Sequence, residues 1–223
     1  MKLLPSIVLL AAAAVAPTMA QNILTADQFF KDVSAQYATI KDYQAQVTVL
    51  AGKQTMSGTV MYKAPSLMRM DFTEPASQVI VYDGQSLVIY VPEFRAILSQ
   101  QTGVANPAGA ATSQGLRMLG RSYSVTFETG PDPVPLPGAE TESVVRLVLS
   151  RLSVAEGFRN IILSIDPARL LIRRMEGITL AGDQIHYDFT KIVLDQDIPA
   201  TKFIYDSPAS ANMYNNFLFS SDN

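Results

Sequence analysis

The sequence contains one histidine and no cysteine, and this limits the chemistry that the chain can perform. A serine nucleophile would need His186 as its base, and no Gly-x-Ser-x-Gly motif accompanies that histidine. Metal sites built from cysteine and histidine are excluded by the same composition. His186 lies in the alternating stretch 185–189 (Ile-His-Tyr-Asp-Phe), whose apolar side chains share one strand face. We therefore expect His186 to face solvent.

Acidic side chains could still act in pairs, as they do in glycoside hydrolases. The candidate carboxylates lie mostly at turns or strand ends: Asp71, Glu74, Glu93, Asp188, Asp195 and Asp197. We therefore expect no catalytic site, no metal site and no cofactor. The chain carries 17 basic and 20 acidic residues, and its basic residues are scattered except for Arg173-Arg174, so nucleic acid is not an expected partner.

The first twenty residues have the composition of a secretory signal peptide. Lys2 is followed by an apolar stretch of about a dozen residues, and residues 18–20 (Thr-Met-Ala) match a cleavage site. The alternative, a membrane anchor, needs around 20 apolar residues, and Pro17 interrupts this stretch too early. We expect a single mature domain over residues 21–223, with neither a lipid anchor nor disulfides, because cysteine is absent.

The spacing of apolar residues predicts one helix followed by many strands. Residues 25–28 (Thr-Ala-Asp-Gln) form a capping box, in which each side chain accepts from the backbone N–H of the other. Behind the box, apolar residues recur at helical spacing and predict an amphipathic helix over about 25–40. The period then changes to two. We expect strands near 43–51, 55–63, 67–73, 78–82, 86–91, 94–99, 122–129, 143–152, 158–165, 169–179, 184–194 and 201–206.

Two stretches interrupt this pattern. Residues 99–115 are small and polar and predict a flexible connection, which leads into a short helix over 115–120 that carries Leu116 and Leu119. Residues 130–138 contain four prolines and predict a stiff protruding loop. The remaining repeated hairpins indicate one large antiparallel sheet, with the first helix covering a face.

The hairpin at residues 77–92 (SQVIVYDGQSLVIYVP) is apolar on both faces. Asp83-Gly84 is typical of a tight turn, and Val79 and Val81 alternate with Ile80 and Tyr82. Both faces must therefore be covered, which favours an incomplete barrel closed by a helix. We expect one hairpin face to pack under the helices and the other to line a cavity. Adaptable side chains for such a cavity are available at Met56, Met61, Met68, Met70, Met118 and Met175.

A second pattern precedes the hairpin: Tyr62-Lys-Ala-Pro65-Ser-Leu-Met68-Arg69-Met70-Asp-Phe72-Thr-Glu-Pro75. Its basic residue and proline, followed by a strand with an arginine between apolar residues, resemble the LolA family of periplasmic lipoprotein carriers, which has an apolar–Arg–aromatic strand here. The Asp83-Gly84 hairpin matches the next part. Residues 185–189 and 200–208 resemble the family's last strands, and the order of elements fits over about 25–210.

The resemblance implies a mainly β, α+β fold: a large antiparallel sheet curved into an incomplete, open β-barrel, with an amphipathic helix and a short helical lid. It also implies a soluble, monomeric periplasmic carrier without a cofactor. Such a carrier accepts acylated lipoproteins from an inner-membrane ATP-driven releasing transporter and passes them to an outer-membrane acceptor. The motif places Met68, Met70 and Phe72 on the concave side, with Leu116 and Leu119 in the lid. The hairpin adds Val79, Val81, Leu87 and Ile89 to the expected cavity lining.

The sequence departs from the family at two points. Met70 stands where the family often has tryptophan, and Ala64 stands where the best-known carriers have an arginine that holds the lid closed. Arg69 is therefore the first candidate for a latch. Two alternatives remain open: a lipid-sensing or envelope-stress interaction module on the same open barrel, and a structural protein whose interior is only a dry core.

Overall fold

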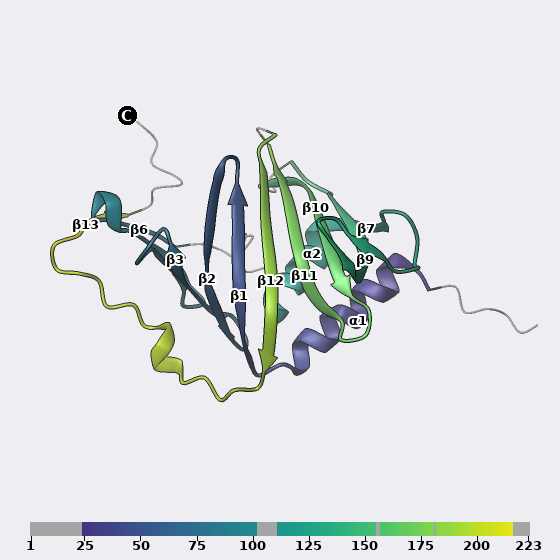
Figure 1. The fold of residues 1–223 in the computed structure, drawn as a ribbon, viewed down its shortest axis with the longest axis horizontal. Helices are drawn as coiled ribbons and strands as arrows, with labels where there is room; N and C mark the ends of the chain where they lie inside the picture. The colour runs from purple at the N-terminus through teal and green to yellow at the C-terminus, as the bar shows by residue number, and fades with distance from the viewer. Residues whose placement is uncertain (1–23, 102–110, 155–156, 181, 216–223) are drawn as a thin grey trace, which may run out of the picture.

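One strongly curved sheet dominates the computed structural model, which describes residues 24–101, 111–154, 157–180 and 182–215 (Figure 1). Its strands are β1 (Asp42–Ala51), β2 (Gln54–Lys63), β3 (Leu67–Glu74), β4 (Val79–Tyr82), β5 (Ser86–Val91), β6 (Ala96–Gln101), β7 (Tyr123–Phe127), β8 (Val134–Leu136), β9 (Ala139–Arg151), β10 (Phe158–Asp166), β11 (Leu171–Thr179), β12 (Gln184–Leu194) and β13 (Asn212–Asn215). Their order is β13-β6-β5-β4-β3-β2-β1-β12-β11-β10-β9-β7, with β8 beside β9. The terminal strands β13 and β7 do not pair with each other, so the sheet is open and the predicted incomplete barrel is confirmed.

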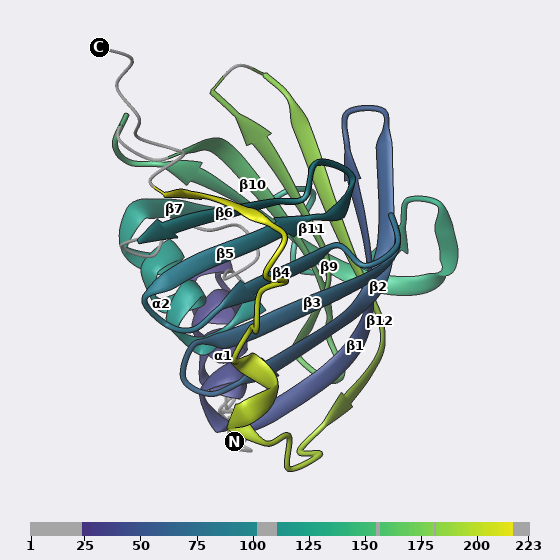
Figure 2. The same cartoon turned by 90° about the vertical axis from the view of Figure 1, so that its left-hand side faces the viewer.

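Helices α1 (Ala26–Thr39) and α2 (Ser113–Ser122) lie within the curve of this sheet. Helix α1 contacts α2, β7 and β11, and α2 contacts β7. Figure 2 shows both helices behind the strands β1 to β6. We call the sheet face toward the helices the inner face and the opposite face the outer face. In the described part of the chain, neither helix is long and apolar enough to cross a membrane.

The beginnings of both helices are set by threonine caps. Thr25 Oγ1 accepts from the backbone N–H of Gln28 at 3.1 Å, and Thr112 Oγ1 accepts from that of Gly115 at 2.9 Å. The reciprocal half of the predicted capping box is wrong, because the Gln28 amide donates to Asp32 at 2.8 Å instead. The second helix is also longer than predicted, since its cap lies three residues before Gly115.

The hairpin β4–β5 closes on Asp83 and Gly84, as predicted. The Asp83 carboxylate accepts from the backbone N–H groups of Gln85 and Ser86, at 2.9 and 2.7 Å. Gly84 has φ +95°, a conformation that favours glycine. Because Asp83 N–H bonds to the carbonyl of Ser86, the two loop residues are Gly84 and Gln85, and Asp83 directly precedes them. Odd-numbered residues of β4 therefore pair with even-numbered residues of β5.

Two predictions, about the C-terminal segment and the proline-rich stretch, are wrong, and one strand was missed. Residues 201–206 do not form a strand, because Lys202 and Ile204 N–H groups bond locally, to Pro199 and Thr201, within a 3₁₀ turn (Ala200–Phe203). The proline-rich stretch 130–138 contains β8, whose Leu136 is fully buried. Strand β13 was not predicted, because two of its four residues are asparagines, which strands disfavour. It runs parallel to β6.

Residues 195–211, which we call the C-terminal strap, cross the outer face between β12 and β13 (Figure 2). The buried Asp42 carboxylate fixes its beginning by accepting from the N–H groups of Gln196 and Ile198, at 2.7 and 3.1 Å. Further along, Phe203 is buried and the ring of Tyr205 lies 6.1 Å from that of Tyr90. The strap therefore covers apolar side chains on the outer face of the β4–β5 hairpin.

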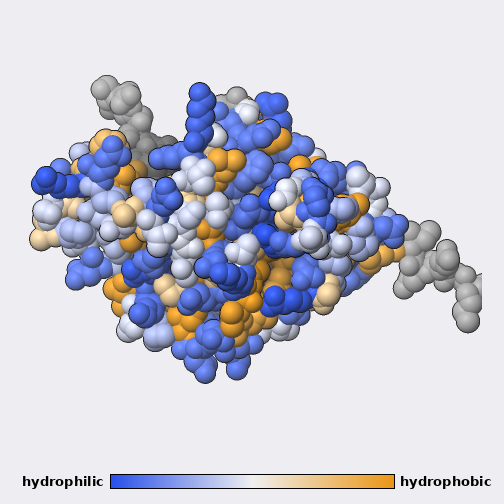
Figure 3. All heavy atoms as spheres, in the orientation of Figure 1, coloured by the Kyte–Doolittle hydropathy of each residue, from blue (hydrophilic) through white to orange (hydrophobic). Residues whose placement is uncertain are grey.

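The outer surface in Figure 3 is largely hydrophilic, with apolar atoms gathered toward the lower ends of the strands in the same view. The charged side chains on β9–β12 form ion pairs there. Arg146 pairs with Glu128 and Glu176, and Arg174 pairs with Asp188. The hydrogen bond that Arg146 donates to Glu128 raises the pKa of Arg146. The charged side chains of β9–β12 that lie on the outer face are therefore paired with one another.

Candidate functional site

The inner faces of β2, β3, β4 and β5 together form an apolar surface. Met70 lies opposite Val60 on one side and Ile80 on the other, and Ile80 lies opposite Ile89. A hollow with about 120 Å³ of free space adjoins this surface. Its lining residues carry no charge: Val49, Met56, Met70, Phe72, Ile80, Leu87, Ile89 and Tyr187. The lining can contact hydrocarbon but offers only one polar group, the Tyr187 hydroxyl.

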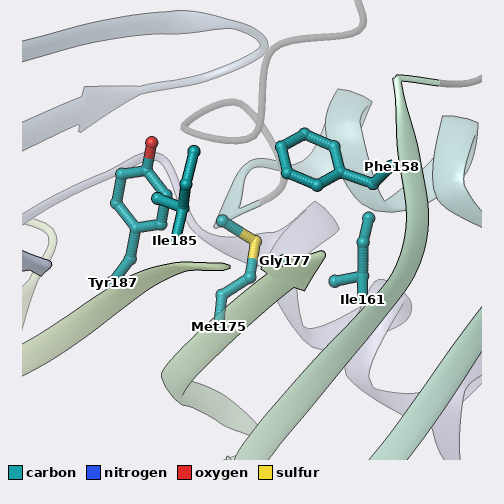
Figure 4. A pocket seen from close by; sticks show the side chains of 6 residues that line it. All are labelled: Phe158, Ile161, Met175, Gly177, Ile185 and Tyr187. Atoms are coloured by element: carbon teal, nitrogen blue, oxygen red, sulfur yellow. The ribbon is translucent and has the colours of Figure 1, made fainter. Parts of the chain in front are cut away.

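A second apolar pocket extends this surface across the curve of the sheet (Figure 4). It has only about 10 Å³ of free space and is lined by Phe158, Ile161, Met175, Gly177, Ile185 and Tyr187. Tyr187 belongs to both pockets because it lies between Val49 on β1 and Met175 on β11. Burial raises the pKa of Tyr187 to about 12, so its hydroxyl stays protonated to a higher pH than that of an exposed tyrosine.

The structure brings five of the seven predicted lining residues onto the inner face. Met70, Phe72, Leu87 and Ile89 line the hollow, and Met68 shares their face beside Tyr82. Met68 and Met70 are 3% and 0% exposed. Whether these side chains contact a ligand is a proposal made below.

Val79 and Val81 lie on the outer face instead. Their partners on β5 are Tyr90 and Val88, and Val81 also lies opposite Arg69. We had placed them with Leu87 and Ile89, which the two-residue loop forbids because it pairs odd with even positions. The expectation that one hairpin face packs under the helices while the other lines a cavity is therefore wrong. The inner face lines the hollow, and the C-terminal strap, not a helix, lies over the outer face.

Several lining residues were missed by the sequence reasoning. Ile80 could have been found, because the register of a two-residue loop places it on the same face as Leu87 and Ile89. Tyr187 and Phe158 come from the other half of the sheet, and no local pattern in the sequence relates them to β3. Met56 and Met175, which were noted only as adaptable side chains, each line a pocket.

Helix α2 is attached to the inner face by two buried tyrosines. Tyr43 donates its hydroxyl to the carbonyl of Ala111 at 3.1 Å. The hydroxyl of Tyr62 lies 3.2 Å from Ser113 Oγ and 3.3 Å from the carbonyl of Pro65. The two rings are 5.2 Å apart, and burial raises the pKa of Tyr43 well above its usual value. These contacts fix the residues at the beginning of α2.

The two predicted lid leucines differ in their burial. Leu116 is fully buried in the core, whereas Leu119 is partly buried against it. Arg69, the candidate latch, lies on the outer face and binds both oxygens of Asp71. Its Nη1 donates to the carbonyl of Lys202 in the strap at 2.9 Å. Because Arg69 and α2 lie on opposite faces of the sheet, Arg69 does not hold the lid.

The predicted position of His186 is confirmed in part. Its side chain lies on the outer face and is 27% exposed, with Nδ1 3.8 Å from Glu176 Oε1. On the same face, the hydrogen bond from Arg173 lowers the pKa of Glu142. The described residues contain no group of three or more acidic or histidine side chains that could hold a metal ion.

Comparisons with known proteins agree with this geometry. The family described as outer membrane lipoprotein carrier protein LolA matches residues 35–206. A protein of Methylibium petroleiphilum named outer-membrane lipoprotein carrier protein is 27% identical over 165 residues, which cover 73% of this chain and 74% of that protein.

Solved structures show the same fold at low sequence identity. An uncharacterized conserved protein from Thermus thermophilus has a TM-score of 0.54 at 14% identity, covering 84% of this chain and 98% of that chain. The crystal structure of MucB has a TM-score of 0.50 at 13% identity, covering 82% of this chain and 63% of that chain. At these identities, the two structures support the fold alone.

Proposed function

This chain belongs to the LolA family, and from that premise we propose that it binds the acyl chains of lipoproteins and carries them through the periplasm. The observation that carries the proposal is the uncharged inner hollow around Met70, which lies on the same side of the sheet as helix α2. The name of the Methylibium petroleiphilum relative supports lipoprotein as the cargo. The proposal assigns no catalytic step to any residue.

The hydrophobic effect explains why such a cargo needs a protein. Burial of lipid contributes about 0.8 kcal/mol per CH₂, so an acyl chain of about 16 carbons requires on the order of 12 kcal/mol of apolar contact. Sites for small molecules usually have volumes of roughly 300–1,000 Å³. Because the hollow has about 120 Å³, it must widen to accept a chain. Met56 and Met70 suit this change, since methionine adapts to irregular space at low cost.

Delivery in one direction requires a donor and an acceptor. In this proposal, an ATP-driven transporter of the inner membrane loads the chain, and an acceptor at the outer membrane receives the lipoprotein. Export by the leader at residues 1–20 would place the protein between these membranes. That leader lies outside the described residues.

The proposal can be tested with the purified mature chain and a palmitoylated peptide, with bound lipid identified by mass spectrometry. Met70→Glu should weaken binding at least tenfold, because an unpaired carboxylate in the hollow must be protonated or reach water. Met61→Glu is the matched control: Met61 is a methionine on the neighbouring strand, opposite Arg69 and therefore on the outer face. It should bind normally.

Equal binding by Met70→Glu and wild type would remove Met70 from the site. Failure of the wild type to bind any acylated peptide would contradict the proposed function. Tight binding without transfer to acceptor vesicles would instead favour the lipid-sensing module, which binds lipid but does not deliver it.

A further inference from the structure

Phe158 occupies an unusual position at the beginning of β10. Ile161 pairs with Gly177 and Asn160 with Ile178, but Phe158 pairs with Thr179, so Arg159 forms a bulge between them. In regular register Phe158 would lie opposite Leu180, and its side chain would point to the outer face. The bulge turns Phe158 to the inner face instead, as bulges commonly re-aim a side chain. Tyr123 holds this arrangement by donating its hydroxyl to the Phe158 carbonyl at 3.2 Å.

The ring of Phe158 lies directly over Gly177. A Cβ atom at position 177 would be 2.6 and 2.7 Å from two carbons of that ring, closer than real Cβ atoms approach their neighbours. Any other residue at this position would therefore displace the ring. Figure 4 shows Phe158, Met175 and Ile185 around one space, which the ring helps to fill. Only about 10 Å³ of that space is free.

Exposed apolar side chains follow the ends of strands β9 and β11, the two neighbours of β10. Leu152 and Val154, in the connection after β9, are 66% and 80% exposed, and Leu180, directly after β11, is 48% exposed. Strand β10 is joined to the residue after β11, because Arg159 Nη2 donates to the Leu180 carbonyl at 3.3 Å. Phe158 and Tyr187 line the same pocket, and Tyr187 also lines the hollow beside Met70, so an apolar lining is continuous from Phe158 to that hollow.

We propose that an acyl chain reaches the hollow along the inner face past the paired ends of β10 and β11, where Phe158 lies opposite Thr179, and that Phe158 is the gate of this path. This inference rests on the proposed function, since it names the route of the same ligand. The ring closes the path while it lies on Gly177 and opens it by rotating away. Gly177 is required because only a residue without a side chain leaves room for the closed position.

The test measures the rates at which an apolar dye, 1-N-phenylnaphthylamine, binds and dissociates in stopped-flow fluorescence, followed by the same measurement with a palmitoylated peptide. Removing the ring by Phe158→Ala should raise both rates roughly tenfold, as a barrier lowered by about 1.4 kcal/mol does. The dissociation constant should change less than the rates. Phe94→Ala is the matched control, because Phe94 is 70% exposed and belongs to neither pocket.

Gly177→Ala tests the closed position of the ring. It should raise both rates in the wild-type background and have no effect in the Phe158→Ala background, because the added methyl group then meets no ring. An equal effect of Gly177→Ala in the two backgrounds would overturn the role of Gly177.

Because the chain has no cysteine, a single one can be introduced and modified selectively. The modified side chain again carries an aromatic ring at position 158. Phe158→Cys should bind dye fast, modification with benzyl methanethiosulfonate should restore slow binding by replacing the ring, and dithiothreitol should reverse the change. Dye binding and dissociation rates equal to wild type in both Phe158→Ala and unmodified Phe158→Cys would overturn the gate. A larger dissociation constant with an unchanged binding rate would overturn it as well. If the wild type binds neither dye nor peptide, the proposed function fails first and this inference with it.

Discussion

Removing the hydroxyl groups of Tyr43 and Tyr62 should release helix α2 while leaving the sheet folded. Tyr43→Phe deletes the hydrogen bond to the Ala111 carbonyl, and Tyr62→Phe deletes the contacts with Ser113 Oγ and the Pro65 carbonyl. Both rings stay, and with them the apolar contacts of two side chains that are 3% and 0% exposed. The substitutions therefore change the attachment of α2 much more than the packing of the core.

The size of the effect follows from the number of bonds. A hydrogen bond between neutral groups contributes about 1 kcal/mol net, so each variant should raise the open population of α2 roughly fivefold. The double variant should raise it by roughly 30-fold if the two effects add. Because the rings are only 5.2 Å apart, some coupling between the effects is expected.

Native-state hydrogen exchange, read by mass spectrometry, measures this opening directly. The amide of Leu116, which donates to the Thr112 carbonyl at 3.0 Å, should lose protection in both variants, while α1 keeps its own. Tyr37→Phe is the matched control. The Tyr37 hydroxyl is also buried, but it accepts from the N–H of Ile172 on β11.

The control should lower protection in α1 and β11 without a selective loss in α2. Unchanged protection of α2 in the double variant would refute the role of the two hydroxyl groups. Equal loss of protection in α1 and α2 would refute it as well, since the effect would then be global. Either result would mean that contacts other than these hydroxyl groups hold α2 on the inner face.

Three further predictions concern other parts of the chain. Leu119→Asp should raise dye binding and hasten cargo loss in fluorescence assays, because a carboxylate opposes the contact of this partly buried side chain with the core. Unchanged dye binding with intact folding would argue against a lid. Arg69→Met should speed chymotrypsin cleavage within the strap and leave the hydrogen exchange of α2 amides unchanged, since Arg69 bonds to Lys202 on the outer face. Faster exchange in α2 would contradict the separation of the two faces. Burial raises the pKa of Tyr187 to about 12, above its unfolded value near 10, so its contribution to stability is complete below pH 10 and is lost as pH rises toward 12. Melting temperatures should fall across that range, and less steeply in Tyr187→Phe; identical slopes would contradict the assignment.

The sequence predicted the elements whose signals are local. The first helix, the Asp83-Gly84 turn and most strands depend on spacing over a few residues, and the structure confirms them. The open sheet followed from the hairpin repeats together with the family resemblance. The inner positions of Met68, Met70 and Phe72 followed from the motif.

Features that depend on contacts between distant segments were not predicted. Val79 and Val81 were placed on the wrong face because the hairpin is apolar on both faces, so its pattern does not show which face is the inner one. The pairing set by the two-residue loop determines which residues of β5 share their face. Arg69 was chosen as a latch by its position in the motif, but its partner, Lys202, is 133 residues away in sequence. The tyrosine contacts with residues 111–113 were missed for the same reason, since tyrosine in a strand usually indicates packing alone.

The separation of the two sheet faces explains how the proposed carrier can open without unfolding. On the outer face, Val81 and Ile97 are 3% and 2% exposed, and Arg69 binds the strap at Lys202. Ion pairs join β9 to β11 and β11 to β12. These contacts hold the strands in register whether or not the hollow is filled. On the inner face, the helix that must move is joined to β1 and β2 by hydrogen bonds near its beginning, each contributing about 1 kcal/mol. An acyl chain that supplies on the order of 12 kcal/mol of apolar contact can displace such bonds easily. The energy of binding can therefore open the inner face while the outer face preserves the sheet.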